Sequence, residues 1–283
     1  MALPDGFDID DFVRRVLAED LGIGGDVTST ATIAEHARFA AVMNARQQLV
    51  VAGLEIAAAF FRALDPHVQV ELQAKDGDRV ELGTPLMRLS GNARAMLAAE
   101  RSALNTLQHL SGIATLTRQY VDAIAGTGTI LLDTRKTIPG LRVLEKYAAR
   151  MGGAHNHRMR LDDGVLIKDN HVAVCGDVAE AVRRAKAANT GLEVQVEVDR
   201  IDQIEPALKA GADRLLLDNM DPAQLRDAVR LVGGRVPLEA SGGVTLETIR
   251  FLAETGVNFI SVGRITQSAP AVDIGLDYAL EQA

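Results

Sequence analysis

Residues 131–142 of the 283-residue sequence read LLDTRKTIPGLR and change in character within a few positions. The apolar run at Leu131 meets an acid, and two adjacent cations, Arg135 and Lys136, follow. Pro139-Gly140 then interrupts the chain, and a helical pattern begins at Leu141. A short buried strand that ends in charges before a helix predicts a βα unit with polar residues beyond the end of its strand.

The same alternation continues through the rest of the chain. Short β-rich runs occupy 129–134, 165–168, 192–199, 214–218, 236–240 and 259–263. Helical patterns lie between them, at 140–151, 177–189, 201–210, 222–232 and 245–255. Such alternation predicts parallel strands with helical crossovers. Six strands are fewer than the eight of a closed barrel, so the residues alone allow an incomplete α/β barrel or a doubly wound sheet.

The N-terminal part is patterned differently. An amphipathic helix is predicted from Asp10 to Leu21, and a second over 54–64, with β-like segments at 38–46 and 48–53 between them. Residues 68–91 alternate like antiparallel strands; part of this stretch is similar to biotin and lipoate carriers, but no modifiable lysine follows it. A helical pattern over 92–125 has a predicted break at Ser111-Gly112. We place the domain boundary there, with an α/β domain at 1–112 and a second domain at 113–283.

The bulk composition limits the classes of function. No apolar run is long enough for a membrane span, and the N-terminus has no basic region followed by an apolar stretch, so we expect a cytoplasmic protein without a membrane partner. A single cysteine, Cys175, excludes an intramolecular disulfide and any multi-cysteine metal site. The net charge of −8 argues against nucleic acid as a partner, and favours focused cations that hold a small anion.

Polar residues end every one of the six runs. The ends read DTRK (133–136), KDNH (168–171), EVD (197–199), LDN (217–219), ASGG (240–243) and SVGR (261–264). In a β/α barrel the carboxyl ends of the strands form the active-site face. Six polar ends in succession, with both signs of charge, therefore predict a site there.

The predicted cations are Arg135, Lys136 and Lys168 at strand ends, with His157 and Arg158 in the loop between them. Arginine grips a carboxylate with two parallel hydrogen bonds, and lysine supplies a compact charge. The alternative is that these residues only pair with nearby acids, namely Asp133, Asp162, Asp163 and Asp169. Five converging cations favour ligand binding. The metal-like spacing of His155 and His157 has no usual third ligand nearby, which argues against zinc.

Two acids, Glu197 and Asp218, face the same predicted site. They suit the binding of hydroxyls or of Mg²⁺ that bridges phosphates, and a salt bridge to Lys168 is the alternative for either one. Gly242-Gly243 lets backbone N–H groups approach an anion, and Thr245 can cap the next helix. A phosphate site after the last strands is common in barrels.

At these residues the sequence resembles the quinolinate phosphoribosyltransferase family. The similarity includes EDLGIGGDVTS (19–29), ERSALNTLQHLSGIAT (100–115) and DTRKTIPGLRVLEKYAARMGGAHNHR (133–158). It continues in the family's order with IKDNH, QVEVD, LLLDNM, EASGGV and SVGRITQSAPAVDIGLD. The resemblance therefore covers nearly the whole chain.

The resemblance implies an N-terminal α/β sandwich followed by an incomplete α/β barrel. It implies transfer of phosphoribose from phosphoribosyl pyrophosphate to the ring nitrogen of quinolinate, which yields nicotinate mononucleotide, CO₂ and pyrophosphate for NAD synthesis. It further implies Mg²⁺ and a homodimer in which each active site borrows part of the neighbour's N-terminal domain.

The resemblance also implies roles for single residues. Those matched to quinolinate binding are Arg101 (from the partner subunit), Thr134, Arg135, His157, Arg158 and Lys168. Those matched to the phosphoribosyl donor are Lys136, Glu197, Asp218, Ser241, Gly242, Gly243, Val262, Gly263 and Arg264. Arg264 replaces a residue that is commonly small or apolar in the family. It has two possible roles, a contact with a phosphate or a contact at an interface. Lys136, Glu197 and Asp218 are the expected catalytic residues, and the two acids the Mg²⁺ ligands, directly or through water and pyrophosphate.

Other readings compete with this one. One is a related phosphoribosyltransferase that uses nicotinate without decarboxylation; another is the similar protein of unknown substrate linked with molybdate transport. A third, from a different class, is a non-catalytic sensor of phosphoribosyl ligands. The cluster Arg101, Arg135, Arg158 and Lys168 favours a dicarboxylate over a monocarboxylate. Turnover of quinolinate would distinguish the quinolinate phosphoribosyltransferase from these three alternatives.

Overall fold

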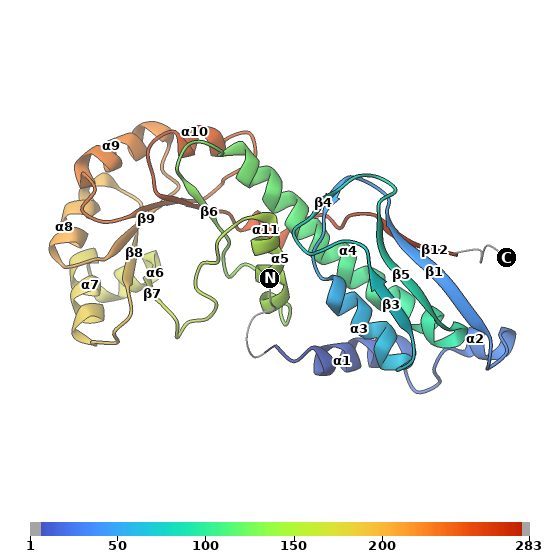
Figure 1. Ribbon diagram of the computed structural model, residues 1–283. Coiled ribbons are helices and arrows are strands. Elements are labelled where there is room, and N and C mark those ends of the chain that lie inside the picture. The colour runs from blue at the N-terminus through green and yellow to red at the C-terminus, as the bar shows by residue number, and fades with distance from the viewer. Residues whose placement is uncertain (1–6, 279–283) are drawn as a thin grey trace. The chain divides into compact units, whose positions relative to one another are not determined.

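The computed structural model describes residues 7–278, which form two compact units (Figure 1). The first unit holds the described residues up to Leu116, together with Val143–Gly152 and the described part of 269–283. The second holds Thr117–Arg142 and Gly153–Ser268. This arrangement differs from the sequence-based division at residue 112, because two later segments of the chain belong to the first unit.

The first unit is built on an antiparallel sheet in the strand order β12-β1-β5-β3. These strands are β1 (Arg38–Ala45), β3 (Gln69–Leu72), β5 (Pro85–Asn92) and β12 (Ile274–Tyr278). The other elements are α1 (Ile9–Leu21), α2 (Val27–Thr32), α3 (Leu54–Leu64) and the short pair β2 (Leu49–Val50) and β4 (Arg79–Val80). The helix over 54–64 is confirmed, whereas β12 was not expected, since its sequence follows the last barrel strand.

Helix α4 (Ala93–Ala123) is continuous, so the predicted break at Ser111-Gly112 is wrong. The Ser111 hydroxyl does not interrupt the helix; it accepts a hydrogen bond from the Ala52 N–H at 3.0 Å. Gly112 has a packing role, because a Cβ there would lie 2.2 Å from the carbonyl oxygen of Pro270. Both residues that indicated a break instead allow close contact between α4 and neighbouring backbone.

The second unit contains a parallel six-stranded sheet in the order β6-β11-β10-β9-β8-β7. Its strands are β6 (Ile130–Leu132), β7 (Val165–Ile167), β8 (Val194–Val198), β9 (Arg214–Asp218), β10 (Leu238–Ser241) and β11 (Phe259–Ser261). The first strand pairs with the last, β11, which is barrel topology and not the order of a doubly wound sheet. Because β6 and β7 do not pair, the barrel is incomplete, as the family resemblance implies.

Helices follow most barrel strands. They are α5 (Arg142–Gly152), α6 (Asp169–Cys175), α7 (Val178–Ala187), a 3₁₀ turn (Ile201–Gln203), α8 (Ile204–Lys209), α9 (Pro222–Val232), α10 (Ile249–Ala253) and α11 (Arg264–Gln267). The helices predicted over 177–189 and 222–232 are confirmed. Helix α6 was missed because it buries no residue, so its sequence carries no apolar stripe.

Alternate residues of the barrel strands face opposite ways. Along β8, Val194, Val196 and Val198 are all buried and apolar, whereas the intervening residues are Gln195 and Glu197. The second set is on the face that carries the polar strand ends. In β8 this polar face leads directly to Glu197 near the carboxyl end of the strand.

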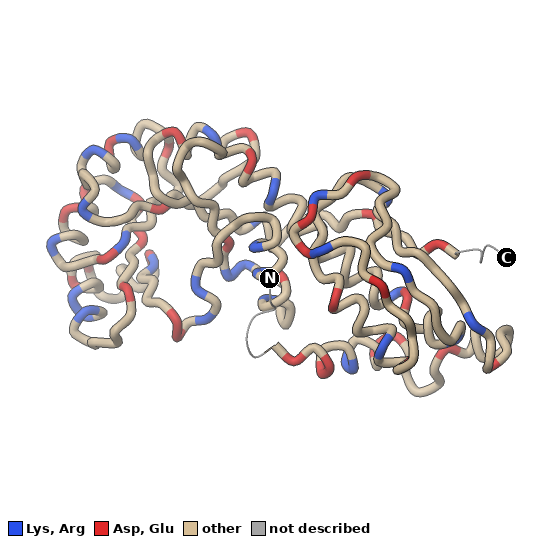
Figure 2. Tube along the Cα trace, in the orientation of Figure 1, with Lys and Arg blue, Asp and Glu red and all other residues tan. Residues whose placement is uncertain are grey.

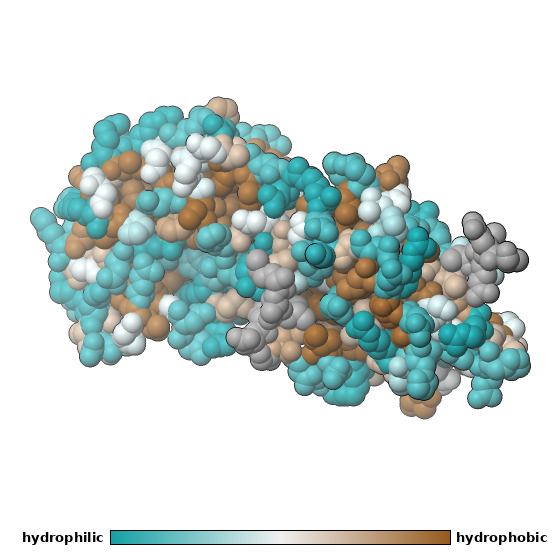
Figure 3. Space-filling model, viewed as in Figure 1, coloured by the Kyte–Doolittle hydropathy of each residue, from teal (hydrophilic) through white to brown (hydrophobic). Residues whose placement is uncertain are grey.

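Charged residues of both signs are interspersed along the chain, as Figure 2 shows. The visible face in Figure 3 is largely hydrophilic, with apolar side chains scattered between polar ones. Among residues 7–278, no helix combines the length and apolarity that crossing a bilayer requires.

Candidate active site

A pocket of about 830 Å³ lies at the carboxyl ends of the barrel strands. It brings together the sequence-predicted residues Thr134, Arg135, Lys136, His157, Arg158, Lys168, Glu197, Asp218, Ser241, Gly242, Gly243, Val262, Gly263 and Arg264. Arg101 is not among the described residues that line it; this arginine is exposed on α4 in the first unit. Residues from six strand ends thus surround one cavity of a size typical for ligand sites.

Two arginines lie close together in this pocket. Burial lowers the pKa of Arg158, and the positive charge of Arg135 lowers it further. Arg158 Nη1 donates to the Gly164 carbonyl at 2.8 Å, whereas the buried Nε of Arg135 has no hydrogen-bond partner within the described chain. Neighbouring cations with an unused donor favour the binding of an anion that carries more than one carboxylate.

A buried acid fixes the loop that carries Arg158. The Asp133 side chain is fully buried, and its Oδ1 accepts the His157 N–H at 2.8 Å. Its other oxygen accepts a hydrogen bond from the Asn156 side chain. The nearby acids Asp162 and Asp163 contact Arg160 and the backbone of Met159. These acids hold the loop in shape, and the charge of Asp163 also raises the pKa of Arg158 against the lowering effects of burial and of Arg135.

The anionic side of the pocket contains Glu197 and Asp218. Lys168 Nζ lies 3.0 Å from Glu197 Oε2, so the ion pair considered as an alternative for Glu197 is present. Burial raises the pKa of Asp218 above its usual value, although the Asn219 side chain and the charges of Lys168 and Lys136 oppose the shift. A carboxylate that burial destabilises gains from a cation placed beside it.

Two glycines of the pocket permit close approach. Gly242 has φ +96°, and a Cβ there would lie 2.1 Å from the Asn219 Oδ1. At Gly263 a Cβ would lie 2.7 Å from the Cδ of Lys136. A side chain at either position would displace a polar neighbour from the pocket wall. The glycines therefore shape the cavity and leave backbone accessible to a ligand.

Sequence reasoning missed several residues of the pocket wall. They are Leu166, Leu216, Glu239, Val244, Gln267 and Ser268, whereas Asp169, Asn219 and Ser261 lie within the polar strand ends that the sequence singled out. Glu239 is the most informative, because it is fully buried and charged. A signal was available: Glu239 lies two residues before Ser241, and residues two apart on a strand share a face. Period-two counting back from each polar strand end would have found it.

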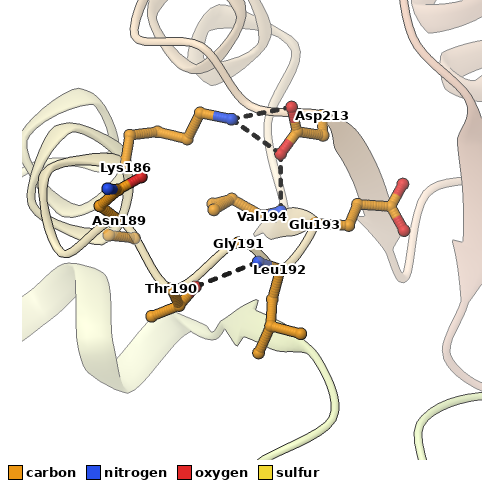
Figure 4. A pocket seen from close by; sticks show the side chains of 9 residues that line it. Lys186, Asn189, Thr190, Gly191, Leu192, Glu193, Val194 and Asp213 are labelled. Atoms are coloured by element: carbon orange, nitrogen blue, oxygen red, sulfur yellow. Dashed lines mark hydrogen bonds and ion pairs between the residues drawn. The ribbon is translucent and has the colours of Figure 1, made fainter.

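A second, smaller pocket of about 380 Å³ lies where β8 and β9 begin (Figure 4). Two of its charged groups pair: Lys186 Nζ lies 2.9 Å from both oxygens of Asp213, and one of these also accepts the Val194 N–H at 2.7 Å. In a barrel this end of the strands serves stability rather than catalysis. We therefore assign the contacts around Asp213 to the fold.

Replacing Asp213 by alanine is expected to lower the free energy of unfolding by about 1–3 kcal/mol, because its hydrogen bonds with Lys186 and with the Val194 N–H are lost. Burial raises the pKa of Asp213, but Lys186 and the Val194 N–H lower it more, so the net shift is downward. The stabilisation is thus present above the unfolded pKa of about 3.9 and is lost as pH falls through the lower folded value. Urea denaturation at pH 7 and pH 3 measures both effects.

The control for Asp213 is Asp227→Ala, which removes an exposed ion pair within α9. It should change the free energy of unfolding by less than about 0.5 kcal/mol. Equal losses in the two variants, or a loss at Asp213 that does not shrink at acid pH, would contradict the assignment.

Models of a known family match both parts of the chain. Residues 26–111 match the N-terminal domain of quinolinate phosphoribosyl transferase, and residues 113–277 match its C-terminal domain. Together these matches cover most of the sequence. They agree with the antiparallel sheet of the first unit and the incomplete barrel of the second.

Individual relatives are similar over nearly their full length. The chain is 43% identical over 269 residues to the probable carboxylating nicotinate-nucleotide pyrophosphorylase of Bacillus subtilis, covering 95% of this chain and 92% of that protein. It is 43% identical to the Mycobacterium leprae protein, covering 94% and 96%. The crystal structure of the Ehrlichia chaffeensis nicotinate-nucleotide pyrophosphorylase superposes with a TM-score of 0.93 at 40% identity, covering 97% and 100%. The chain belongs to the quinolinate phosphoribosyl transferase family.

Proposed function

We propose that the strand-end pocket is the active site of a decarboxylating quinolinate phosphoribosyltransferase. The enzyme transfers phosphoribose from phosphoribosyl pyrophosphate to quinolinate, and nicotinate mononucleotide, CO₂ and pyrophosphate are released. The observation that carries this assignment is that Arg135 and Arg158 line the same pocket, where burial and then the charge of Arg135 lower the pKa of Arg158. A ligand with two carboxylates relieves that repulsion, and a monocarboxylate relieves less of it.

The proposed quinolinate side of the pocket contains Thr134, Arg135, Arg158 and Lys168. Two arginines offer fork-shaped donors to the two carboxylates, and Lys168 adds a third charge. These groups would place the ring nitrogen against the anomeric carbon of the ribose. Such positioning converts an encounter of two substrates into a reaction within one complex, which lowers the barrier substantially.

The proposed donor side contains Lys136, Glu197 and Asp218. Departure of pyrophosphate leaves positive charge at the anomeric carbon, which the two carboxylates can stabilise, while Lys136 neutralises the leaving group. The ring nitrogen, once ribosylated, is positively charged. That charge stabilises the electron pair left on the ring when the adjacent carboxylate departs as CO₂, and this ring carbon then takes up a proton from water to give nicotinate mononucleotide. The residues act by electrostatics, with no side chain required to form a covalent bond.

The 5′-phosphate of the donor is assigned to the glycine loops of the pocket, at Ser241, Gly242, Gly243, Val262 and Gly263. The positive φ of Gly242 and the absent side chain at Gly263 leave room for backbone N–H groups to approach phosphate oxygens. Arg264 lines the same wall and is exposed, so its charge is available to a phosphate.

Glu197 and Asp218 would hold Mg²⁺ together with the pyrophosphate of the donor. Within residues 7–278 no three metal-binding side chains of the His, Cys, Asp or Glu type cluster together. Two carboxylates with substrate phosphates and water are what Mg²⁺ commonly uses in such enzymes, and the raised pKa of Asp218 marks a carboxylate that a cation would favour. Bound Mg²⁺ would neutralise charge on the departing pyrophosphate.

Arg101 is proposed to complete the active site of a second subunit. The residue is exposed on α4 and belongs to a different unit from the pocket residues. In a two-fold dimer such a contact would repeat reciprocally, so each pocket would receive one Arg101. We also assign the enzyme to the cytoplasm, where its lone cysteine would remain reduced.

The purified protein is expected to release CO₂ and pyrophosphate in equal amounts from quinolinate and phosphoribosyl pyrophosphate, and only with Mg²⁺ present. Radiolabelled carboxylate and a coupled pyrophosphate assay measure the two products. Asp218→Asn serves as the control, since it removes one proposed catalytic charge while preserving side-chain size. Consumption of nicotinate instead of quinolinate would reject the decarboxylating assignment, and binding without turnover would favour a sensor.

A further inference from the structure

A buried carboxylate, Glu239, connects the barrel interior to the pocket. Its side chain is fully buried on β10, and one oxygen, Oε2, is the focus of three contacts. Gln195 Nε2 lies at 2.9 Å, Arg214 Nη2 at 2.7 Å and His157 Nε2 at 3.5 Å. The first two partners extend from β8 and β9, so barrel strands fix the carboxylate. The third contact links it to the loop of Arg158.

The charge of Glu239 is maintained despite its burial. Burial raises its pKa, but the contact with His157, the charge of Arg214 and a hydrogen bond from Ser261 lower it more, and the net pKa lies below the usual value. The guanidinium carbon of Arg214 lies 3.9 Å from the centroid of the Phe259 ring, which holds that cation in place. Glu239 is therefore an ionised acceptor at neutral pH.

The hydrogen bonds of His157 determine which ring nitrogen carries its proton. The backbone N–H of Arg158 donates to His157 Nδ1 at 2.7 Å. A backbone N–H can only donate, so Nδ1 accepts and has no proton of its own. The ring proton is then on Nε2, which faces the Glu239 carboxylate. Only 14% of the His157 side chain is exposed, because both nitrogens are engaged inside the protein.

We propose that Glu239 is a positioning residue for the reaction. It holds His157 in the Nε2–H form, and Nδ1 of that ring in turn fixes the backbone N–H of Arg158, whose guanidinium receives a quinolinate carboxylate. His157 is then the link between Glu239 and Arg158, rather than the direct quinolinate ligand that the family resemblance implies. The inference rests on the proposed function of the pocket.

Steady-state kinetics of Glu239→Gln test this role. The amide oxygen cannot serve Gln195, Arg214 and His157 as the carboxylate does, so the KM for quinolinate should rise roughly tenfold. The KM for phosphoribosyl pyrophosphate should be unchanged. If Glu239 acts through His157, adding Glu239→Gln to His157→Ala should raise the quinolinate KM no further. Arg160→Ala is the control: that arginine is exposed in the same loop as His157, pairs with Asp162, and its loss should leave both KM values unchanged.

Each result decides between the two assignments. An unchanged quinolinate KM in Glu239→Gln, equal rises for both substrates, or additive effects with His157→Ala would overturn the positioning role. An unchanged quinolinate KM in Arg158→Ala would instead overturn the proposed pocket, and the positioning role with it. If the quinolinate KM rises in Arg158→Ala but not in Glu239→Gln, the proposed function stands and only the positioning role of Glu239 is overturned.

Nitrogen NMR of the wild-type protein gives a test that does not depend on enzyme activity. The spectrum of ¹⁵N-labelled His157, assigned by its loss in His157→Ala, should show the proton on Nε2 and a bare Nδ1. A proton on Nδ1 would overturn the inference directly. In Glu239→Gln the preference for Nε2–H should weaken.

Discussion

The Arg158→Ala enzyme is expected to need at least about thirty times more quinolinate for half-maximal rate, with the KM for phosphoribosyl pyrophosphate unchanged. Removing one partner of a desolvated charge pair costs about 2–5 kcal/mol, and each 1.4 kcal/mol corresponds to roughly tenfold. Much of this cost comes from the carboxylate that is left buried without a partner. Initial rates with each substrate varied in turn measure the two constants.

The folded state of Arg158→Ala should be nearly as stable as the wild type. The hydrogen bond to Gly164 and the attraction of Asp163 are lost, but burial of a charge and repulsion from Arg135 are lost as well, so the free energy of unfolding should change by about 1 kcal/mol at most. Arg160→Ala is the matched control, since that arginine is in the same loop but is exposed and pairs with Asp162. Equal rises in both KM values for Arg158→Ala would contradict its assignment to quinolinate.

Two inactive variants, Arg101→Ala and Lys168→Ala, are expected to recover activity when they share a dimer. A hybrid has one site with intact Arg101 from one chain and intact Lys168 from the other, while its second site carries both defects. Random pairing makes roughly half of the dimers hybrids, so mixing after unfolding and refolding should restore about a quarter of wild-type activity. Differently tagged chains allow the hybrids to be isolated and assayed.

Arg135→Ala with Lys168→Ala provides the control pair. Both residues line the pocket of one barrel, so each site of their hybrid would lack one of them and the mixture should stay inactive. If the Arg101 and Lys168 hybrids also stay inactive after isolation, then Arg101 serves its own chain's site or none. Recovery in both mixtures would mean that the pocket residues themselves divide between subunits.

The barrel was accessible from sequence because its signals are local. Each strand ends in polar residues that a buried strand would not contain, such as the pair Arg135 and Lys136, and the carboxyl ends of parallel strands meet at one face. Polar residues that recur along the sequence at the strand ends therefore come together in space at that face. The residues alone nonetheless left the barrel and the doubly wound sheet equally open. The pairing of β6 with β11, which decides between them, joins residues far apart in the sequence.

The sequence-based predictions that failed did so because they depended on contacts between residues far apart in the sequence. Gly112 looked like a helix breaker, and only its 2.2 Å approach to Pro270 reveals a packing role. Glu239 follows an apolar residue within a short strand, and its meaning depends on Arg214 and His157, which come from other elements. Local patterns cannot show which partners a buried charge will meet. The contacts of Glu239 were therefore not predicted, whereas the polar residues at the strand ends were.

The pairing of β1 with β12 has a consequence for the order in which the protein is made. Ala45 pairs with Ile274, and the whole barrel is encoded between them. During synthesis β1 leaves the ribosome early and can pair with β5, but its other edge has no partner until translation passes Tyr278. An unpaired edge strand is a template for association with other chains. In the nascent first unit one edge of β1 therefore stays without its native partner until the barrel has been synthesised.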